Sequence, residues 1–507
     1  MIKQVIAVGI ALASSFFLAA CGVLAPAAPA AKQLTITVGS LPQSGDPNFD
    51  TSLFANPVYR LMYDTLIESD SGSPQPALAE SWKQVDGLTW DFKLRSGLKF
   101  QNGEPLDAIA VKWNFDRIKD PATKSQWAPR FGLVDSVEAV DSATVRFHTS
   151  QPFATLLGNL VKLSLVPPKY FQDKGQAAFN TAPLGNGAYT VTEWKQDDHI
   201  TLRANKDYWR GVPAIDTITF RLMPEASARV ASLQAGESQI LYALPPEQAD
   251  PLKGQGFQVV SNSIAHSFIV VLRNNTESPL QDVRVRQAIN YAIDKDLIIK
   301  ELLAGFGRKL EGQIVGPDAV GFNPDLKAYP YDADKARALL KDAGYPDGFT
   351  IQFQGSAGRY IKDKEVEEAV VNQLSKVGIK ANLEILESGV WLDKWINATY
   401  APMFDVAILY GPFMDVEAAL PSFTTFASPV HAYTDPKLDD LYRQQATLSN
   451  PDQRLAVLKQ ATQLMYEQAA ALYLFQVPGV YAASKNVKGL DFRADYSIKD
   501  VTKLSVE

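Results

Sequence analysis

The sequence predicts an α/β protein with two lobes, between which the chain passes more than once. Three observations predict this architecture. A chain of 507 residues is too long for one ordinary hydrophobic core. Helical and strand patterns alternate between residues 332 and 409, which is typical of an α/β lobe. Strand patterns dominate much of the N-terminal half and return at residues 481–492, which indicates that the tail crosses back to the first lobe.

The first 20 residues have the pattern of a signal peptide. Lys3 precedes an apolar run, Val5 to Leu18, that is too short to span a bilayer comfortably. The segment that ends at Cys21 reads LAAC and resembles a bacterial lipobox, in which Cys21, the single cysteine, carries a lipid. The alternative is an ordinary secretory signal with an incidental cysteine. Residues 21–33 are rich in Ala and Pro, and we expect them to form the lipidated end and an extended tether.

The stretch from Thr89 to Ile118 predicts a strand, a hairpin and a helix. Trp90, Phe92 and Leu94 alternate with polar residues, as in a strand buried on one face. The run resumes at residues 98–100 and reaches a turn at residues 102–103, which predicts a hairpin. Asp107 stands where the N-cap of an amphipathic helix is expected. Residues 134–147 predict two further strands around a turn.

The second lobe is predicted to begin near Ser267, where FIVVLRNN has the composition of a strand. Residues 283–300 predict one helix with an apolar face. Helices at 332–343, 364–377 and 391–398 then alternate with strands at 350–354, 381–386 and 405–409. Two further helices between residues 436 and 473 are expected to meet at Asn450 and Pro451.

Composition and motifs exclude several function classes. The 49 Lys and Arg residues are outnumbered by 56 Asp and Glu, with no basic block, which argues against a nucleic-acid partner. The sequence contains no Gly-x-Ser-x-Gly, His-Glu-x-x-His or Cys-x-x-Cys motif, and its four histidines are scattered. We therefore expect no catalysis, no cofactor and no metal. The carboxylates of Asp363, Glu365, Glu367 and Glu368 are expected on a solvated helix face. Gly185-Asn186-Gly187 precedes strand patterns, so it lacks the helix that a phosphate loop requires.

Eight segments, in order along the chain, resemble the extracellular solute-binding proteins of family 5, the dipeptide-, oligopeptide- and nickel-binding components of bacterial ABC importers. The segments are YDTLI (63–67), PQPALAESW (74–82), the stretch 89–118, PLGNGAY (183–189), DYWRGVPAID (207–216), DVRVRQAINYAIDK (282–295), AGYPDGF (343–349) and KVGIKANLE (376–384).

The resemblance implies a two-lobe, periplasmic-binding-protein-like clamshell of class II, cluster C type, with a small α/β domain inserted in the first lobe. Lobe I is expected to comprise residues 34–60, 168–266 and 481–507, the inserted domain residues 61–167, and lobe II residues 267–480. In such proteins the ligand lies between the lobes, which close around it by a hinge motion. We expect a monomer.

The function that this resemblance implies is solute capture for an ABC importer. The expected protein is anchored through Cys21 in the periplasm or at the outer face of the cytoplasmic membrane, and delivers its ligand to permease subunits with their ATPases. A peptide or peptide-like ligand is favoured. The alternatives are a nickel chelate, an opine or a sugar, a sensory or chaperone-like lipoprotein, and, last, a secreted hydrolase.

The resemblance also nominates ligand-binding residues. In the peptide-binding relatives an arginine receives the ligand carboxylate, and the matching segment GSAGRY offers Arg359 or its neighbour Tyr360. Tyr410 matches the aromatic residue of a further motif. Pro412 or Phe413 stands where those relatives hold the peptide amine with an aspartate, so Asp415 is the candidate replacement.

Further candidates come from the nickel-binding relatives and from the aromatic residues. Glu417 stands where the nickel-binding relatives have a histidine. Lys124 and Trp127 resemble the basic and aromatic pair of their small domain, which suits an anionic chelate. Trp391 and Trp395, together with Tyr410, are expected near the cleft, although core packing is an equal alternative for each of these aromatic side chains.

Overall fold

A computed structural model describes residues 32–507, apart from residues 51, 71–72, 411–413, 426, 429, 431 and 449. Cys21, the predicted signal peptide, and Pro412 with Phe413 therefore lie outside the described residues. In the part of the chain that is described, no helix combines the length and the apolar character needed to cross a membrane.

Eleven strands of the described chain form one mixed sheet. Their order is β15-β14-β16-β12-β17-β11-β1-β10-β9-β8, with β13 paired to β17. Strand β1 runs parallel to β10 and β11, and β14 runs parallel to β15 and β16. The bounds are β1 Gln33–Val38, β8 Tyr189–Lys195, β9 His199–Ala204, β10 Thr217–Leu222, β11 Ile240–Tyr242, β12 Gln258–Leu272, β13 Arg308–Lys309, β14 Phe349–Ser356, β15 Ile379–Leu386, β16 Met403–Leu409 and β17 Ala471–Ala483.

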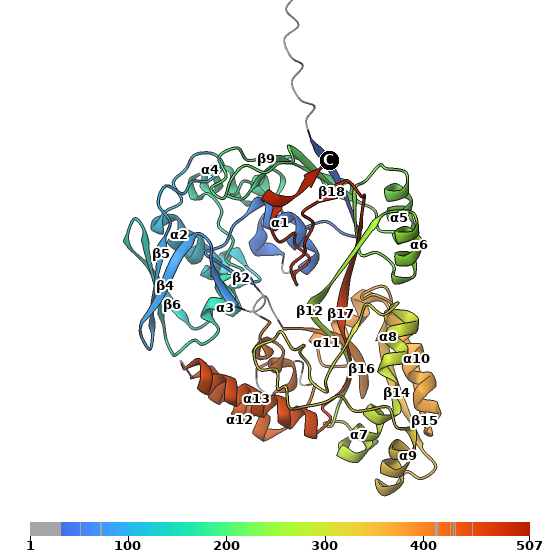
Figure 1. Ribbon diagram of the computed structural model, residues 1–507. Coiled ribbons are helices and arrows are strands. Elements are labelled where there is room, and N and C mark those ends of the chain that lie inside the picture. The colour runs from blue at the N-terminus through green and yellow to red at the C-terminus, as the bar shows by residue number, and fades with distance from the viewer. Residues whose placement is uncertain are drawn as a thin grey trace, which may run out of the picture. The chain divides into compact units, whose positions relative to one another are not determined.

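Two long antiparallel strands, β12 and β17, cross from one half of this sheet to the other (Figure 1). We call the half with β1 and β8–β11 lobe I, and the half with β14–β16 lobe II. Every residue of β17 is buried. The register of the pair slips between Ser263 and Ser267, which marks an irregularity between the two halves. The sequence predicted this strand only from Ser267, but β12 begins at Gln258. Its first residues pair with the C-terminal end of β17 in lobe I.

The core of lobe I lies between its strands and its flanking helices. Ile36, Phe220 and Tyr481 come from three strands and are fully buried there. The chain ends on this lobe with a small two-stranded sheet. The bounds are α1 Asn56–Met62, α4 Pro168–Thr181, α5 Ala226–Gln234, α6 Ala249–Gly254, β18 Val487–Lys488 and β19 Ser505–Val506.

A small domain has its own four-stranded antiparallel sheet, in the order β4-β5-β7-β6, covered by helix α2. Phe92, Phe115 and Phe147 form its aromatic core, with ring centroids 5.3–5.4 Å apart in edge-to-face contacts. The bounds are β2 Ile67–Asp70, β3 Ser73–Pro76, β4 Ala79–Asp86, β5 Thr89–Leu94, α2 Ala108–Lys119, β6 Val134–Asp141, β7 Thr144–Thr149 and α3 Leu156–Leu160.

The structure confirms the predicted cap of α2 and reduces the predicted hairpin to one antiparallel bridge. The Asp107 carboxylate accepts a hydrogen bond from the backbone N–H of Ala110 at 3.0 Å. Strand β5 pairs with β4 and β7. Residues 98–100 belong to no named strand, but the chain turns at Gly103 and Lys99 forms an antiparallel bridge with Pro105. The two strands predicted at residues 134–147 are β6 and β7.

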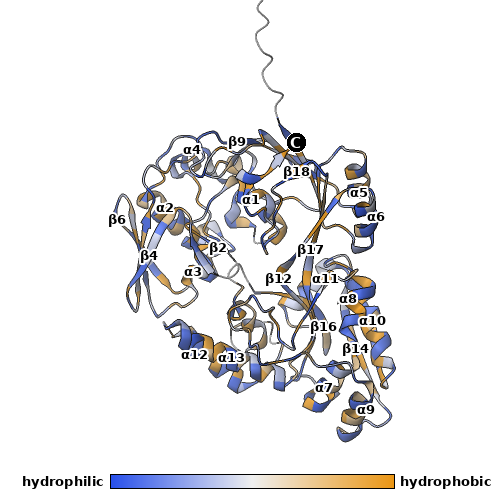
Figure 2. Cartoon of the chain, in the orientation of Figure 1, coloured by the Kyte–Doolittle hydropathy of each residue, from blue (hydrophilic) through white to orange (hydrophobic). Residues whose placement is uncertain are grey.

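Lobe II surrounds its strands with helices whose polar and apolar residues are interspersed (Figure 2). The helix predicted over residues 283–300 is two helices, because the chain leaves helical geometry at Ile293 and Asp294 caps the next helix by accepting from Leu297 at 2.9 Å. Asn450 caps α13 after the predicted break. The bounds are α7 Val283–Ala292, α8 Lys295–Leu302, α9 Ala333–Asp342, α10 Asp363–Ser375, α11 Ser388–Ile396, α12 Pro436–Ala446 and α13 Pro451–Glu467.

Two carboxylates of α10 overturn the prediction that this helix face is solvated. Asp363 and Glu367 are 3% and 0% exposed, while their neighbours Glu365 and Glu368 are exposed as expected. The buried pair points toward Ser356 on β14 and Asp405 on β16. The Ser356 hydroxyl lies 2.6 Å from Oδ2 of Asp405, and the Ser356 N–H donates to Oε1 of Glu367 at 3.0 Å.

The Gly185-Asn186-Gly187 loop serves close packing. A Cβ atom on Gly185 would lie 2.1 Å from the carbonyl oxygen of Met62, and one on Gly187 would lie 2.6 Å from that of Leu61. Only glycine permits this approach of the loop to α1. The loop continues into β8, as the sequence predicted.

Candidate functional site

A cavity of about 290 Å³ lies where lobe I, the small domain and lobe II meet. Strand β12 lines it with Asn262, Ser263 and Ala265, at the point where that strand passes between the lobes. Other lining residues come from helix α1, from residues 127–130 and 158–162 of the small domain, from lobe II and from the C-terminal tail. A cavity of this size, enclosed by three parts of the chain, has the properties of a small-solute site.

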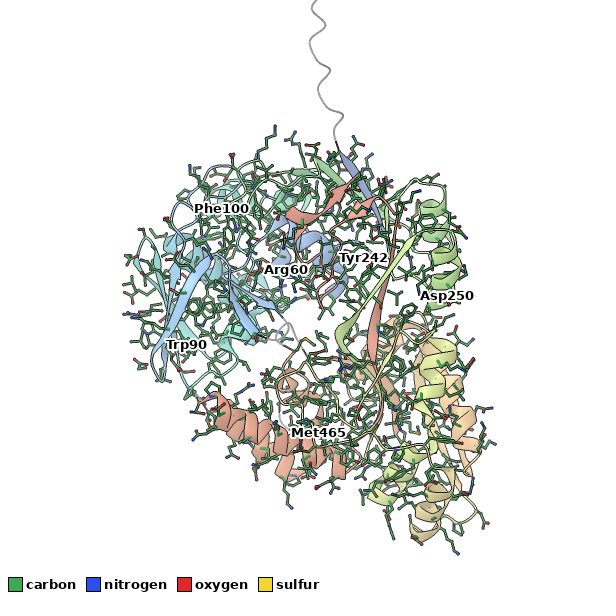
Figure 3. All side chains as sticks on the ribbon, in the orientation of Figure 1. Arg60, Trp90, Phe100, Tyr242, Asp250 and Met465 are labelled. Atoms are coloured by element: carbon green, nitrogen blue, oxygen red, sulfur yellow. The ribbon has the colours of Figure 1, made fainter. Side chains whose placement is uncertain are left out.

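The charged side chains that line the cavity are mostly cations. The cations are Arg60, Arg130, Lys162, Arg493 and Lys499, and the anions are Asp318 and Asp495. Arg60, labelled in Figure 3, projects from α1 and lies 3.4 Å from the Asp495 carboxylate. Arg493 lies 3.1 Å from the carboxylate of Glu68, and Asp318 lies 3.2 Å from Arg308.

The tail segment 492–499 is held in place by the crossing strand. The side-chain amide of Asn262 donates to the carbonyl of Arg493 at 2.8 Å, and the N–H of Ala265 donates to the carbonyl of Ala494 at 3.1 Å. Within the segment, Tyr496 adopts a φ of +68°, a left-handed conformation that is uncommon outside glycine. The strand thus presents Arg493 and Asp495 to the cavity.

Asp495 and Lys162 influence the pKa of each other. Burial alone would raise the pKa of Asp495, but Arg60 and Lys162 hold it well below its ordinary range. Burial lowers the pKa of the Lys162 ammonium to about 8, because it removes water from the charged form, and the nearby Arg60 and Arg130 act in the same direction. Asp495 partly offsets these effects.

Of the residues nominated from the sequence, Trp127 lines the cavity. Its ring is 9% exposed, and its Nε1–H donates to the carbonyl of Pro47 at 3.1 Å, which ties the small domain to lobe I. Lys124 is exposed, has a left-handed φ of +51°, and does not line the cavity.

Two of the nominated aromatic residues of lobe II, Trp391 and Tyr410, lie in its core, and Trp395 packs against it. Trp391 is 1% exposed, donates to Asp405 at 2.6 Å and stacks on Trp395. Tyr410 is fully buried and accepts from the amide of Gln476 at 2.6 Å. None of these three side chains lines the cavity.

Arg359 and Tyr360 lie against this aromatic group rather than on the cavity wall. The Arg359 guanidinium is 4.2 Å from the centre of the Trp391 ring, and its Nε donates to the Tyr360 hydroxyl at 3.1 Å. The backbone N–H groups of both residues donate to the Asp363 carboxylate at 2.8 Å and 3.0 Å, which fixes the loop.

The two nominated carboxylates of lobe II have partners within the protein. Oδ2 of Asp415 lies 2.6 Å from Nη1 of Arg454. Glu417 accepts from the hydroxyl of Tyr442 at 3.3 Å. Burial and the nearby Asp415 raise the pKa of Glu417 to about 7, against the opposing charges of Arg454 and Arg130. In the described part of the chain, no three His, Cys, Asp or Glu side chains form a group that could hold a metal ion.

Sequence reasoning missed all of the charged residues that line the cavity among the described residues. One signal was available for Lys162, because it is the only charged residue in the largely apolar run 156–165. A charge in such a run either reaches solvent or faces a cavity. Arg60 and Asp495 gave no such signal, since they are 435 positions apart and meet only in the folded protein.

Comparison with known proteins places this architecture in a family. A family model described as bacterial extracellular solute-binding proteins, family 5, middle region, matches residues 73–433. The chain belongs to the bacterial extracellular solute-binding proteins of family 5. The resemblance drawn from the sequence segments is thereby confirmed, as is the two-lobe α/β clamshell.

The similarity to known proteins covers nearly the full length of this chain. A glutathione-binding protein, GsiB, from Shigella flexneri serotype 5b is 30% identical over 500 residues, which cover 95% of this chain and 96% of the relative. GsiB from Pectobacterium atrosepticum is 31% identical over 490 residues, covering 93% and 94%. A solved structure of the ABC transporter-associated periplasmic binding protein DppA from Helicobacter pylori, in complex with the peptide STSA, has a TM-score of 0.77, 25% identity, and coverage of 94% and 98%.

Proposed function

We propose that this protein is the substrate-binding component of an ABC importer, which captures a small peptide or peptide-like solute outside the cytoplasmic membrane and delivers it to a permease. The cavity enclosed by both lobes and the small domain is the observation that carries this proposal. The names of similar proteins support a peptide or peptide-like ligand. Two of these proteins are named glutathione-binding proteins, and a third is described in complex with a peptide.

The proposed mechanism uses the two strands that join the lobes. Strands β12 and β17 are the natural hinge, because they alone run through both halves of the described sheet and their register is irregular at Ser263. Closure would bring Asp318 and Met414 of lobe II toward the tail and the small domain, and would remove the ligand from water. The closed form would then dock on the permease, while ATP is hydrolysed by other subunits.

We further propose that the three parts of the fold are the domains predicted from the sequence, with lobe I at 34–60, 168–266 and 481–507, the inserted domain at 61–167, and lobe II at 267–480. The proposed protein acts as a monomer and is held at the membrane by a lipid on Cys21. In this arrangement the segment up to residue 33 serves as anchor and tether, and takes no part in ligand binding.

Uptake in a deletion strain tests the proposal. Cells that lack this chain should lose import of the solute that the purified protein binds, and should regain it when the wild-type gene is returned. The variant Gly158→Trp, which places a bulky side chain at a cavity-lining position, should bind no solute and restore no import. Gly87→Trp is the matched control, because Gly87 lies at an exposed turn where an added Cβ atom would meet nothing within 4 Å. Unchanged import in the deletion strain would contradict the transport role and favour a sensory one.

A further inference from the structure

The side chains that line the cavity carry more positive than negative charges. Five cationic side chains and two anionic ones line it among the described residues. Much of this charge is already compensated, since Arg60 pairs with Asp495, Arg493 pairs with Glu68, and Asp318 pairs with Arg308. Lys499 also interacts with another group of the protein. The cations that remain to be considered are Arg130 and Lys162.

Unlike these paired side chains, Arg130 and Lys162 have no carboxylate in direct contact in the described part of the chain. Among the residues that the structure describes, no carboxylate oxygen lies within 4.0 Å of either side chain. Arg130 instead lies 5.7 Å from the centre of the Trp127 ring. Lys162 interacts with Asp495, and Arg130 with Glu417, only at longer range. Lys162 is partly buried, whereas Arg130 is exposed. Keeping the Lys162 charge partly out of water without a paired anion is costly, so the site is incomplete at Lys162.

Both cations are held on the same wall of the cavity by the small domain. The side-chain amide of Asn159 donates to the carbonyl of Arg130 at 3.0 Å, and the backbone N–H of Lys162 donates to the carbonyl of Asn159 at 3.0 Å. Leu160 and Val161, next to Lys162, are fully buried and anchor this segment in the domain core. The backbone that carries the two positive side chains is therefore fixed, which lowers the ordering cost of binding an anion.

We infer that the ligand is a small organic acid, such as an acidic peptide, whose carboxylate binds between Lys162 and Arg130. This inference deepens the proposed solute-binding function and rests on it. An arginine supplies a planar fork of donors for a carboxylate, and a lysine supplies a compact charge. The lobe II part of the lining differs, because Leu409 and Met414 are apolar and Asp318 is the only acid that lobe II contributes among the described lining residues. The cavity thus favours a ligand with its negative end toward the small domain.

Titration calorimetry with matched acid and ester probes tests the inference. Glutathione carries two carboxylates, and its diethyl ester keeps the same skeleton without them. The wild-type protein should bind glutathione, or an acidic tripeptide from a small panel, at least about tenfold more tightly than the corresponding ester, since a charge-assisted contact is worth about one to two orders of magnitude in affinity.

Substitutions on the cavity wall separate this charge effect from a structural one. Lys162→Met should weaken binding of the acid by about tenfold or more and leave binding of the ester unchanged, whereas Lys162→Arg should retain the preference for the acid. Lys124→Met is the matched control, because Lys124 is an exposed lysine of the same domain that does not line the cavity. A circular dichroism melting curve checks that each variant is folded.

The outcomes distinguish this inference from the function on which it rests. If esters, neutral peptides or cationic peptides bind as tightly as the acids, or if Lys162→Met leaves the ratio of affinities unchanged, the acid-binding inference is overturned while solute binding stands. The same inference is overturned if no acid of the panel binds. In these binding experiments, the proposed function itself fails if no solute of either kind binds and none co-purifies with the protein.

Discussion

Asp415 and Arg454 form an ion pair in lobe II, with 2.6 Å between Oδ2 and Nη1. The side chains are 15% and 10% exposed, so the pair is largely removed from water. Oδ1 of the same carboxylate accepts from the N–H of Glu417 at 2.9 Å. Both oxygens of Asp415 are therefore engaged by the protein itself, which gives the residue a structural role whether or not a ligand amine reaches it.

Replacing Asp415 with Asn should lower stability rather than ligand affinity. The change leaves the Arg454 charge without its partner, and we expect the free energy of unfolding to fall by about 1–3 kcal/mol in urea denaturation. Asp440→Asn is the control, because Asp440 belongs to an exposed pair that contributes little. A tenfold loss of ligand affinity in Asp415→Asn, with stability unchanged, would instead support Asp415 as the residue that binds the ligand amine.

The affinity for an acidic ligand should depend on pH through Lys162. Its pKa is lowered to about 8 by burial, with Arg60 and Arg130 acting in the same direction and Asp495 opposing them. The ammonium is charged below that pH, so affinity should be constant between pH 6 and 7, where the cation is intact. Above pH 8 the free protein loses the charge, and the association constant should fall by up to about tenfold per pH unit.

Calorimetry at pH 6.5, 7.5 and 9.5 measures this dependence. The variant Lys162→Arg is the control, since arginine stays protonated over the whole range. Its affinity should therefore vary little with pH. If the affinity of the wild type and of this variant fell equally with pH, a group other than Lys162 would be the one that titrates.

The buried carboxylates of lobe II should make stability fall as pH rises. Burial, and then the adjacent Asp405, raise the pKa of Glu367 far above its ordinary range. The folded protein therefore holds a proton that the unfolded chain releases above about pH 4.3, and this contribution to stability declines as pH increases toward the folded-state pKa.

The variant Glu367→Gln tests this effect directly. Glutamine cannot ionise, and its amide can still donate toward Asp405, so the variant should unfold at higher urea concentration than the wild type at pH 8, with a smaller difference at pH 5. Glu368→Gln, on the exposed side of the same helix, should change stability by less than about 0.5 kcal/mol at both pH values. A wild type that gains stability between pH 5 and pH 8 relative to Glu367→Gln would refute the proton assignment.

The predicted lipid anchor can be tested at Cys21. The variant Cys21→Ser retains the apolar segment but lacks the thiol that lipidation requires, so labelled palmitate should enter the wild-type protein alone. The wild type should fractionate with membranes, and the variant should be soluble outside the cytoplasm or remain unprocessed. Palmitate in Cys21→Ser would exclude this residue as the attachment site.

Local patterns predicted the parts of this fold that depend on neighbouring residues. The Asp107 cap, the break at Asn450 and the strands at residues 134–147 each follow from a few consecutive positions. The single helix predicted over 283–300 was wrong because the apolar spacing continues across Asp294, whose side chain caps a new helix. An apolar period alone cannot distinguish one helix from two in such a case.

The cavity depends on contacts that no local pattern encodes. Arg60 meets Asp495 from the opposite end of the chain, and Asn262 holds the tail segment from the crossing strand. Asp363 and Glu367 were expected in solvent because their helix carries other charges, yet Ser356 and Asp405 approach them from separate strands. Lys162 was missed as well, although a lone charge in a largely apolar run is visible in the sequence itself.

The most direct test of the central claim is native mass spectrometry of residues 32–507, purified from rich medium and compared before and after denaturation. We predict that the wild-type protein and the surface control Gly87→Trp carry a small acidic molecule that is released on unfolding, and that the cavity-filling variant Gly158→Trp is empty. A wild type that carries no small molecule, or a Gly158→Trp variant as fully loaded as the wild type, would contradict the claim that this cavity holds the solute.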